Sequence, residues 1–269
     1  MPRILRPLLS LPVLGVALVL IAPLLVLLGA ALFPPGINPA PGQWWPADPS
    51  LAALQRAWSL ADMGSALGHS LWISLAGMLL ATAVASLGGL GLHLGPARWR
   101  RPLLILLVLA ASVPYVTLWL PRFILFRSLG WHEGLVPLLA PALIGGSPLL
   151  VLLYYLAMRQ LSPATFEAAR LEGLGPLALW WRVALPQVPG TTLAVAFLSF
   201  AGFWGNTLDP LIYLRGSDWT TAPLALHGLE LLGRGELSVW LAGASLLLLP
   251  LTVLLALALP WLKSLEKPL

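Results

Sequence analysis

Few residues of this chain could do chemistry, and the densest group of them lies in one polar segment between two long apolar stretches. The segment reads Glu167-Ala168-Ala169-Arg170-Leu171-Glu172-Gly173, and after nine further residues comes Val183-Ala184-Leu185-Pro186. Glu167 could anchor a basic residue of a partner, and the small side chains of Ala168 and Ala169 would let another backbone approach closely. These residue types favour recognition of another protein over catalysis.

Other candidate sites are weak. The four histidines, His69, His93, His132 and His227, are scattered and show no metal-ligand spacing. The absence of cysteine excludes thiolate catalysis and thiolate metal sites. Residues 88–95 are rich in glycine, but no strand precedes them and no Lys-Ser or Lys-Thr follows, so close packing of helices is the better interpretation. We expect no catalytic residue, cofactor or metal in this chain.

The elements that position the polar segment are membrane spans. Of the 269 residues, 59% are hydrophobic and 9% are charged, against about 25% charged in soluble domains. Six apolar stretches are long enough to cross a bilayer. They cover residues 8–32, 68–94, 102–120, 134–157, 188–208 and 239–262. We therefore predict an all-α integral membrane protein with six transmembrane helices, several of them kinked by proline.

The distribution of basic residues predicts the orientation, since Lys and Arg that flank membrane spans stay cytoplasmic. With the N-terminus inside, ten of the fifteen basic residues fall on the inner side. Both termini and the segment 159–187 are then cytoplasmic. Because the basic residues lie in short clusters beside apolar runs, we interpret them as topology signals and expect no nucleic-acid partner. Arg122, Arg127 and Asp209 are costly in lipid, so they should lie at the membrane interface or face a polar cavity, and we expect the interface.

The polar segment itself predicts a helix, a bend and a second helix. Ser162 is a suitable N-cap, Pro163 suits the first helical position, and Gly173 can end the helix. A second helix restarts at Pro176, and Leu185-Pro186 turns the chain into the fifth span. The predicted product is a helix-bend-helix element at the cytoplasmic surface.

The spacing of this segment resembles the EAA loop of ABC importer permeases, which is Glu-Ala-Ala, three residues, Gly, nine residues, Ile or Val, any residue, Leu-Pro. Every fixed position of that pattern is met. Looser stretches over most of the chain are similar to the carbohydrate-type permeases, in particular the smaller, six-helix subunit related to the maltose permease. These stretches are Trp45-Pro46-Ala47-Asp48-Pro49-Ser50, Ser70-Leu71-Trp72-Ile73-Ser74, Thr165-Phe166-Glu167-Ala168-Ala169, Trp204 and Pro210-Leu211-Ile212-Tyr213-Leu214.

The resemblance implies a type I ABC importer permease fold in a bacterial inner membrane. The chain would form half of a pathway for a sugar or sugar derivative, together with a second and different permease subunit. Two cytoplasmic ATPases, which bind ATP and Mg, would dock on the EAA-type loops, and an extracytoplasmic solute-binding protein would deliver the substrate. Residues 1–67 would hold the first span and first periplasmic loop, residues 68–262 the permease core, and residues 263–269 a short cytoplasmic tail.

The same resemblance assigns candidate site residues. The ATPase-coupling loop would use Glu167, Ala168, Ala169, Arg170, Glu172, Gly173, Val183, Leu185 and Pro186. An outer segment with Pro210, Tyr213 and Arg215 would face the binding protein. The chain departs from the family pattern around Asn206 and in its C-terminal tail, so no role of Asn206 and no contact between the tail and the ATPase is implied.

Three other functions are compatible with an apolar six-span chain. A permease for polyamines, metal complexes or other small solutes would keep the EAA-type loop and change only the pathway. A membrane-embedded enzyme would need acidic, His or Ser groups that converge at membrane depth, and the sequence shows none. A non-transporting scaffold would leave the activity of any ATPase unchanged.

Overall fold

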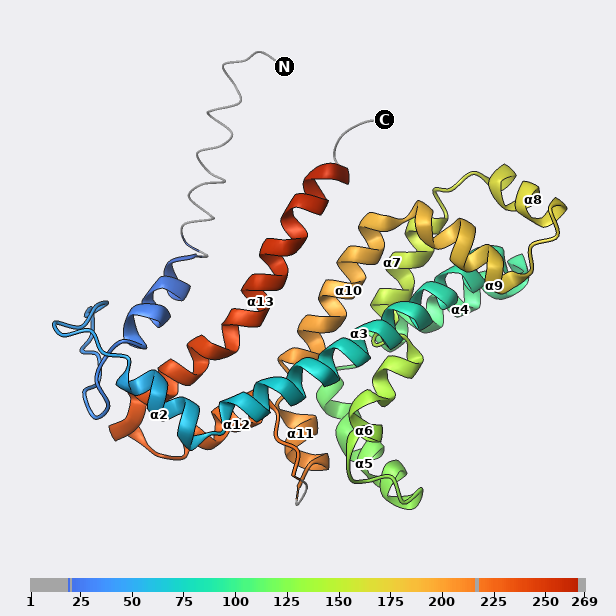
Figure 1. Ribbon diagram of the computed structural model, residues 1–269. Coiled ribbons are helices and arrows are strands. Elements are labelled where there is room, and N and C mark those ends of the chain that lie inside the picture. Colours follow the sequence, from blue (N-terminus) through green and yellow to red (C-terminus); the bar gives the residue numbers. More distant parts are fainter. Residues whose placement is uncertain (1–18, 20, 216–217, 266–269) are drawn as a thin grey trace, which may run out of the picture. The chain divides into compact units, whose positions relative to one another are not determined.

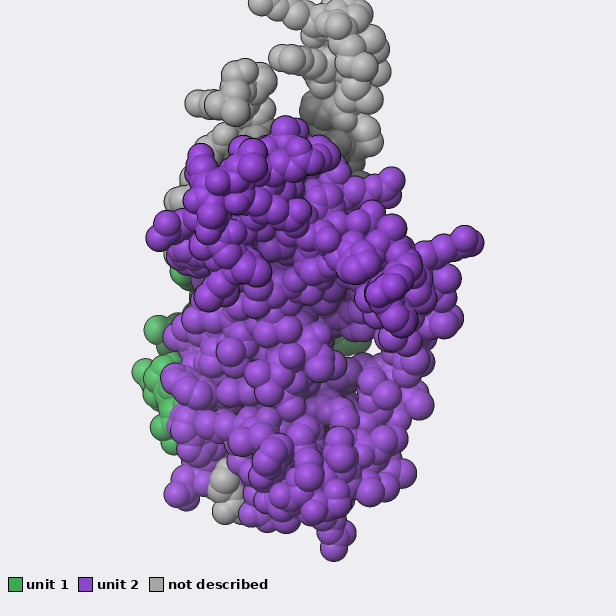
Figure 2. All heavy atoms as spheres, turned by 90° about the vertical axis from the view of Figure 1, so that its right-hand side faces the viewer, with its two compact units in different colours: residues 1–67, 222–253 green, residues 68–221, 254–269 purple. Residues whose placement is uncertain are grey.

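The computed structural model describes residues 19, 21–215 and 218–265, with the side chains of Arg234 and residues 257–265 left aside (Figure 1). The chain divides into two compact units, shown in Figure 2. Unit 1 comprises Met1–Leu67 and Ala222–Val253, and unit 2 comprises Gly68–Thr221 and Leu254–Leu269. All regular elements of the described residues are helical, which confirms the predicted all-α class.

Unit 1 is held together by small side chains. Its elements are a helix over Ile21–Ala30, α2 (Ala52–Leu60), the start of α3 (Met63–Leu94), α12 (Ala222–Glu230), η5 (Arg234–Glu236) and most of α13 (Leu237–Leu265). The buried core contains Ala31, Ala53, Ala57, Met63, Ala66, Ala222, Ala225, Leu229, Val239 and Ala242. Seven of these ten are alanine, and alanine lets helix backbones approach closely. An ion pair between Arg56 and Glu236, with 2.7 Å between Nη2 and Oε1, links α2 to η5.

Unit 2 carries the remaining helices. They are α4 (Ala97–Ala111), η1 (Tyr115–Leu118), α5 (Trp119–Ser128), α6 (Leu135–Leu139), η2 (Ala140–Ile144), α7 (Pro148–Met158), α8 (Pro163–Leu171), α9 (Pro176–Leu179), η3 (Trp180–Ala184), η4 (Leu185–Gln187), α10 (Pro189–Trp204) and α11 (Leu208–Tyr213). The main core of unit 2 joins side chains of α3, α7, α8, α9 and α10. A smaller core joins α3, α5, α6 and α11.

The glycine-rich end of α3 is a helix contact, as the sequence predicts. A Cβ on Gly89 would lie 2.6 Å from the Cβ of Tyr154 and 2.8 Å from the backbone nitrogen of Tyr155. A Cβ on Gly88 would lie 3.1 Å from Val151. The backbones of α3 and α7 therefore touch here, and the glycines serve packing.

The predicted third span, residues 102–120, is broken in the structure. It is a pair of helical segments, Ala97–Ala111 and Tyr115–Ser128, which meet at an angle of 95°. Pro114 accounts for the break, because proline has no backbone N–H and disfavours helical conformation at the residue before it. The sequence predicts that proline kinks or breaks spans of this chain, and the structure agrees at Pro114; the predicted end of the span at residue 120 was wrong, because the second helical segment continues to Ser128.

The other predicted spans agree with the structure to within a few residues where the chain is described. Three helical segments are apolar and long enough to cross a bilayer: α3, Leu135–Met158 and Leu237–Ala256. Two bent pairs, Ala97–Ala111 with Tyr115–Ser128 and Pro176–Gln187 with Pro189–Trp204, could each supply one more span. The segment Leu135–Met158 is interrupted at Gly145 and Gly146, both with positive φ. Most of the predicted first span and the end of the tail lie outside the described residues.

The side chain of Arg100 caps the C-terminal end of α3. Arg100 donates from Nε to the carbonyl of Leu92 at 3.2 Å and from Nη2 to the carbonyls of His93 at 2.8 Å and Gly95 at 3.3 Å. A helix leaves its last carbonyls unpaired, and a cation there also complements the negative end of the helix dipole. Arg100 satisfies both requirements.

We expect Arg100→Ala to lower the free energy of unfolding by about 1–3 kcal/mol, because three carbonyls lose a charged donor. The measurement is the melting temperature of the detergent-solubilised protein. Arg101→Ala is the matched control, since the neighbouring Arg101 is exposed and takes no part in this cap. Equal melting temperatures for the two variants would contradict the capping role.

Candidate functional site

The polar segment forms the helix-bend-helix element that its sequence predicts. Helix α8 begins at Pro163 with Ser162 in the N-cap position, although the Ser162 side chain makes no capping hydrogen bond. Gly173 ends the helix with φ +79°, a backbone conformation that glycine adopts at little cost. Helix α9 follows from Pro176 and continues through η3 and η4 to Gln187. Figure 1 shows α8 at one extremity of unit 2.

One face of α8 is exposed and the other is buried. Glu167, Ala168, Arg170, Leu171 and Glu172 are exposed, and Leu171 is 89% exposed. Phe166 and Ala169 point inward and join the main core of unit 2. The prediction that both Ala168 and Ala169 lie on an open face was therefore wrong for Ala169, because residues 166 and 169 share the helix face that packs on the core.

The charges on the exposed face are unpaired. Within the part of the chain that the structure describes, Glu167, Arg170 and Glu172 make no ion pair. A strongly apolar side chain, Leu171, stands among them. An apolar residue surrounded by free charges of both signs is a surface that another protein can recognise.

The second half of the element is anchored to the bundle. Val183 and Leu185 are half-buried against the main core, and Pro186 is exposed. Trp180 donates from Nε1 to Ser86 Oγ of α3 at 2.9 Å. The angle between the segment Pro176–Gln187 and α10 is 94°. The element is thus tied to α3 by a hydrogen bond and to α10 through the chain.

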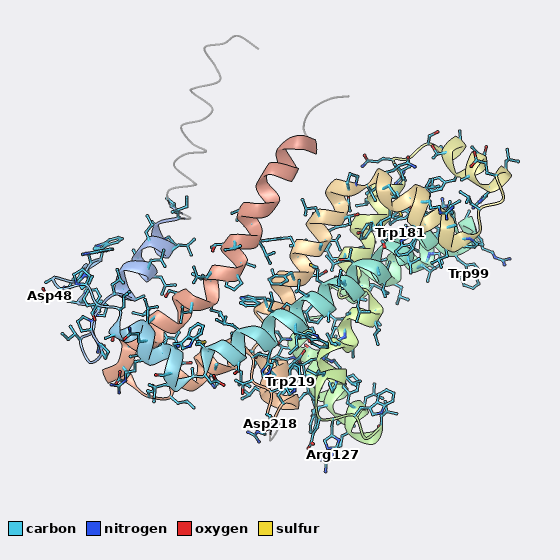
Figure 3. All side chains as sticks on the ribbon, in the orientation of Figure 1. Asp48, Trp99, Arg127, Trp181, Asp218 and Trp219 are labelled. Carbon is cyan, nitrogen blue, oxygen red and sulfur yellow. The ribbon has the colours of Figure 1, made fainter. Side chains whose placement is uncertain are left out.

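Residues that are predicted to lie on opposite sides of the membrane lie at opposite ends of unit 2. Figure 3 labels Trp99, next to the arginine cluster that begins at Arg98, and Trp181 at one end of unit 2. It labels Arg127 and Asp218 at the other end. The helix-bend-helix element from Pro163 to Gln187, called the coupling element below, therefore lies at the opposite end of the unit from the predicted outer residues.

The predicted outer docking residues are largely buried. Tyr213 is 1% exposed and packs with Phe123 and Phe126, and Pro210 is also buried. Arg215 alone of the three is exposed. The selection of Pro210 and Tyr213 as contact residues was therefore wrong for this conformation, since their side chains belong to the helix packing beneath the surface.

Two of the charges that the sequence predicts at the membrane interface, Arg122 and Asp209, belong to a buried ionic network. Asp209 is 0% exposed and pairs with Arg122, with 3.3 Å between Oδ2 and Nη2. Tyr115 donates to Asp209 Oδ2 at 2.5 Å, and Asn206 Nδ2 donates to the same oxygen at 2.9 Å. Arg122 also donates to the carbonyl of Pro137 at 3.2 Å. The carboxylate thus joins α11, η1 and α5 through side chains.

This network corrects the expected location of two charges. Arg122 and Asp209 do not stand separately at the interface, and only Arg127 is exposed. The sequence contained a hint of this pair, because an acid and a base that are both costly in lipid stabilise each other when they pair. They lie 87 residues apart, so one sequence alone does not reveal that they meet.

A cavity of about 450 Å³ adjoins the network. Its walls come from η1, α5, the start of α7 and the end of α10. The lining includes aromatic and uncharged polar side chains, namely Tyr115, Trp119, Phe203, Ser147, Ser199, Asn206 and Thr207, together with the aliphatic residues Val116, Pro141, Leu150, Leu198 and Leu208. None of the described residues that line it carries a charge. The cavity is therefore neutral although a buried ion pair lies beside it.

Comparison with known proteins gives the family. The model of the binding-protein-dependent transport system inner membrane component matches residues 86–263, which is most of the chain and includes the whole coupling element. The chain belongs to this family. Family membership agrees with the expectation of a membrane-embedded transport subunit that is not itself an enzyme.

Several permeases of the family resemble the chain in sequence. The arabinooligosaccharides transport system permease of Halalkalibacterium halodurans is 26% identical over 70% of this chain and 66% of its own length. The lactose transport system permease of Rhizobium radiobacter is 25% identical over 68% and 66%. The melibiose/raffinose/stachyose import permease of Bacillus subtilis is 23% identical over 78% and 76%. The match to the first two thus spans slightly less than two thirds of each relative.

A solved structure shares the fold. A chain of a bacterial ABC transporter involved in the import of the acidic polysaccharide alginate superimposes with a TM-score of 0.73 and covers 99% of both chains at 16% identity. The fold of this family member is therefore that of an ABC importer permease, as the EAA-type spacing predicts.

Proposed function

We propose that this chain is the permease subunit of an ABC importer for a sugar or sugar derivative, and that α8 and the segment after it couple it to a cytoplasmic ATPase. The observation that carries the proposal is the exposed face of α8, with its unpaired charges and Leu171, on an element anchored to α3 and α10. A surface of this kind suits a partner that pushes on the element as a rigid body.

The proposed complex has several chains. A second, different permease subunit completes the pathway, two ATPase subunits bind ATP and Mg and dock on the coupling elements, and an external binding protein delivers the solute. The charge bias supports cytoplasmic termini, and the family description supports the inner membrane. Three sugar-related names among the relatives support the solute class, and the neutral cavity favours a neutral solute over a polyamine.

The test is ATP-driven uptake by the reconstituted complex in liposomes. The panel of solutes is raffinose, lactose and arabinooligosaccharides, with spermidine as the non-sugar alternative. We expect uptake of at least one saccharide that needs ATP, the binding protein and this chain. Uptake of spermidine alone would contradict the sugar assignment, and ATPase activity that is independent of this chain would contradict the permease assignment.

A variant of the coupling element tests the docking face. We expect Glu167→Ala combined with Gly173→Pro to abolish uptake, because the first change removes an exposed anchor and the second is incompatible with the positive φ of Gly173. The measurement is uptake and ATP hydrolysis in the same liposomes, with assembly checked by size-exclusion chromatography. Pro186→Ala, at an exposed position farther along the element, is a milder comparison. Unchanged uptake by the assembled double variant would contradict coupling through α8.

A further inference from the structure

The cavity beside the Asp209–Arg122 pair has the chemistry of a saccharide site. Its volume of about 450 Å³ falls within the range of roughly 300–1,000 Å³ that small-molecule sites occupy. Tyr115, Trp119 and Phe203 supply aromatic surface, and Asn206 and Thr207 supply an amide and a hydroxyl. Aromatic faces can cover the C–H surfaces of a sugar ring, while amides and hydroxyls can bond to its hydroxyl groups.

The polar part of the cavity is held in place by the buried network. Asn206 Nδ2 donates to Asp209 Oδ2, and the backbone nitrogen of Asp209 donates to Asn206 Oδ1 at 3.1 Å. One N–H and one acceptor lone pair of the amide remain unused by these two bonds. Tyr115 is fixed by its own bond to Asp209. The side chains at this end of the cavity are therefore preorganised for a ligand.

Two further polar groups in the wall have no protein partner. Ser199 is 5% exposed, and its Oγ makes no hydrogen bond within the described residues. The same holds for Nε1 of Trp119. A buried polar group without a partner is destabilising unless a water molecule or a ligand satisfies it. Both atoms are themselves enclosed by protein, so a ligand in the cavity reaches them only when these side chains rotate toward it.

The charge balance of the site selects the class of ligand. Asp209 is neutralised by Arg122, and the described lining residues are uncharged. A free carboxylate would favour a cation and a free guanidinium would favour an anion. With neither available, the site favours a neutral polyhydroxylated ligand.

We propose that this cavity is a saccharide subsite within the pathway, formed by this subunit alone, with Trp119 as an aromatic platform and Asn206 and Thr207 as polar contacts. The proposal rests on the proposed function, because a saccharide must be the transported solute. It adds the position of the solute within this chain and the residues that determine its neutral character.

The absence of native cysteine makes a direct test possible. Thr207→Cys places one thiol in the cavity wall, and Ser128→Cys places a control thiol at an exposed position in the predicted outer loop that does not line the cavity. Each reconstituted complex is treated with a small, cationic, membrane-impermeant methanethiosulfonate reagent, with and without the saccharide that it imports. We expect that saccharide to slow labelling of Thr207→Cys at least fivefold and to leave the labelling rate of Ser128→Cys unchanged.

A kinetic measurement provides the second arm. Trp119→Ala should raise the KM for the imported saccharide about tenfold, a loss of about 1.4 kcal/mol, while Trp119→Phe should retain most of the affinity because the aromatic face remains. A wholly structural role for Trp119 would instead lower the amount of assembled complex without changing KM.

The outcomes separate this inference from the proposed function. Import of a saccharide without protection of Thr207→Cys, or with the parent KM in assembled Trp119→Ala, would overturn the subsite alone. Failure of Thr207→Cys to react at all would overturn it as well, because the cavity would then be closed to water. An assembled, ATP-hydrolysing complex that imports no saccharide of the panel would overturn the proposed function and the subsite with it.

Discussion

Asp209→Ala is expected to lower the free energy of unfolding by about 3–5 kcal/mol, the effect of removing one partner of a buried ion pair. The carboxylate is 0% exposed and accepts hydrogen bonds from Tyr115, Arg122 and Asn206. Its removal leaves the Arg122 guanidinium, whose side chain is 16% exposed, without a counter-charge in a nonpolar environment. The measurement is the melting temperature of the solubilised protein, followed by tryptophan fluorescence.

The control for this prediction is removal of both charges. Arg122→Met combined with Asp209→Leu should recover most of the lost stability, because a buried pair replaced by apolar residues of similar volume is often neutral or stabilising. The recovery should be incomplete, since the carbonyl of Pro137 also loses its donor. If the double variant melts below Asp209→Ala, the two charges do not act as a pair. Asp209→Asn, which keeps the shape and loses the charge, should fall between Asp209→Ala and the parent.

Gly89→Ala is expected to destabilise the protein by about 1–3 kcal/mol or more, as overpacking of a well-packed contact does. The added methyl group would lie 2.6 Å from the Cβ of Tyr154 and 2.8 Å from the backbone nitrogen of Tyr155. Neither atom can move without shifting α7. Because α7 also belongs to the main core of unit 2, the shift should reach α10 and reduce uptake as well as stability.

Gly91→Ala is the matched control, because the same substitution in the same helix meets nothing within 4 Å. There the only change is in helix propensity, which favours alanine by about 1 kcal/mol. The two variants should therefore shift the melting temperature in opposite directions. Destabilisation by both would show that α3 needs glycine for conformational freedom rather than for its contact with α7.

The sequence predicted most of this architecture because the responsible interactions are local. Apolar length predicted the spans, and Gly173 and Pro176 predicted the bend after α8, since each acts within a few residues. Proline within the third span predicted a kink or a break but not the angle of 95°, because the effect of proline in a membrane helix depends on neighbouring groups that satisfy the freed carbonyls. Sequence alone does not tell whether such neighbours exist.

The candidate site likewise combines features that follow from the local sequence with features that depend on the fold. The exposed face of α8 was predicted in outline, but Ala169 packs inward beside Phe166, and that choice of face depends on the bundle beneath. The Asp209–Arg122 pair and the cavity beside it depend on contacts between residues distant in sequence, so they emerge only from the fold. Tyr213 was misassigned because an aromatic residue beside an outer loop is equally suited to the surface and to the core.

The 94° angle between the segment Pro176–Gln187 and α10 has a mechanical consequence. When two stiff helical segments meet at a right angle, a force along the axis of the first acts perpendicular to the axis of the second. A partner that presses on the coupling element along its length would therefore swing α10 sideways rather than drive it along its own axis. Because α10 contributes Ser199, Gly202 and Phe203 to the cavity wall, such a swing would open or narrow the cavity directly.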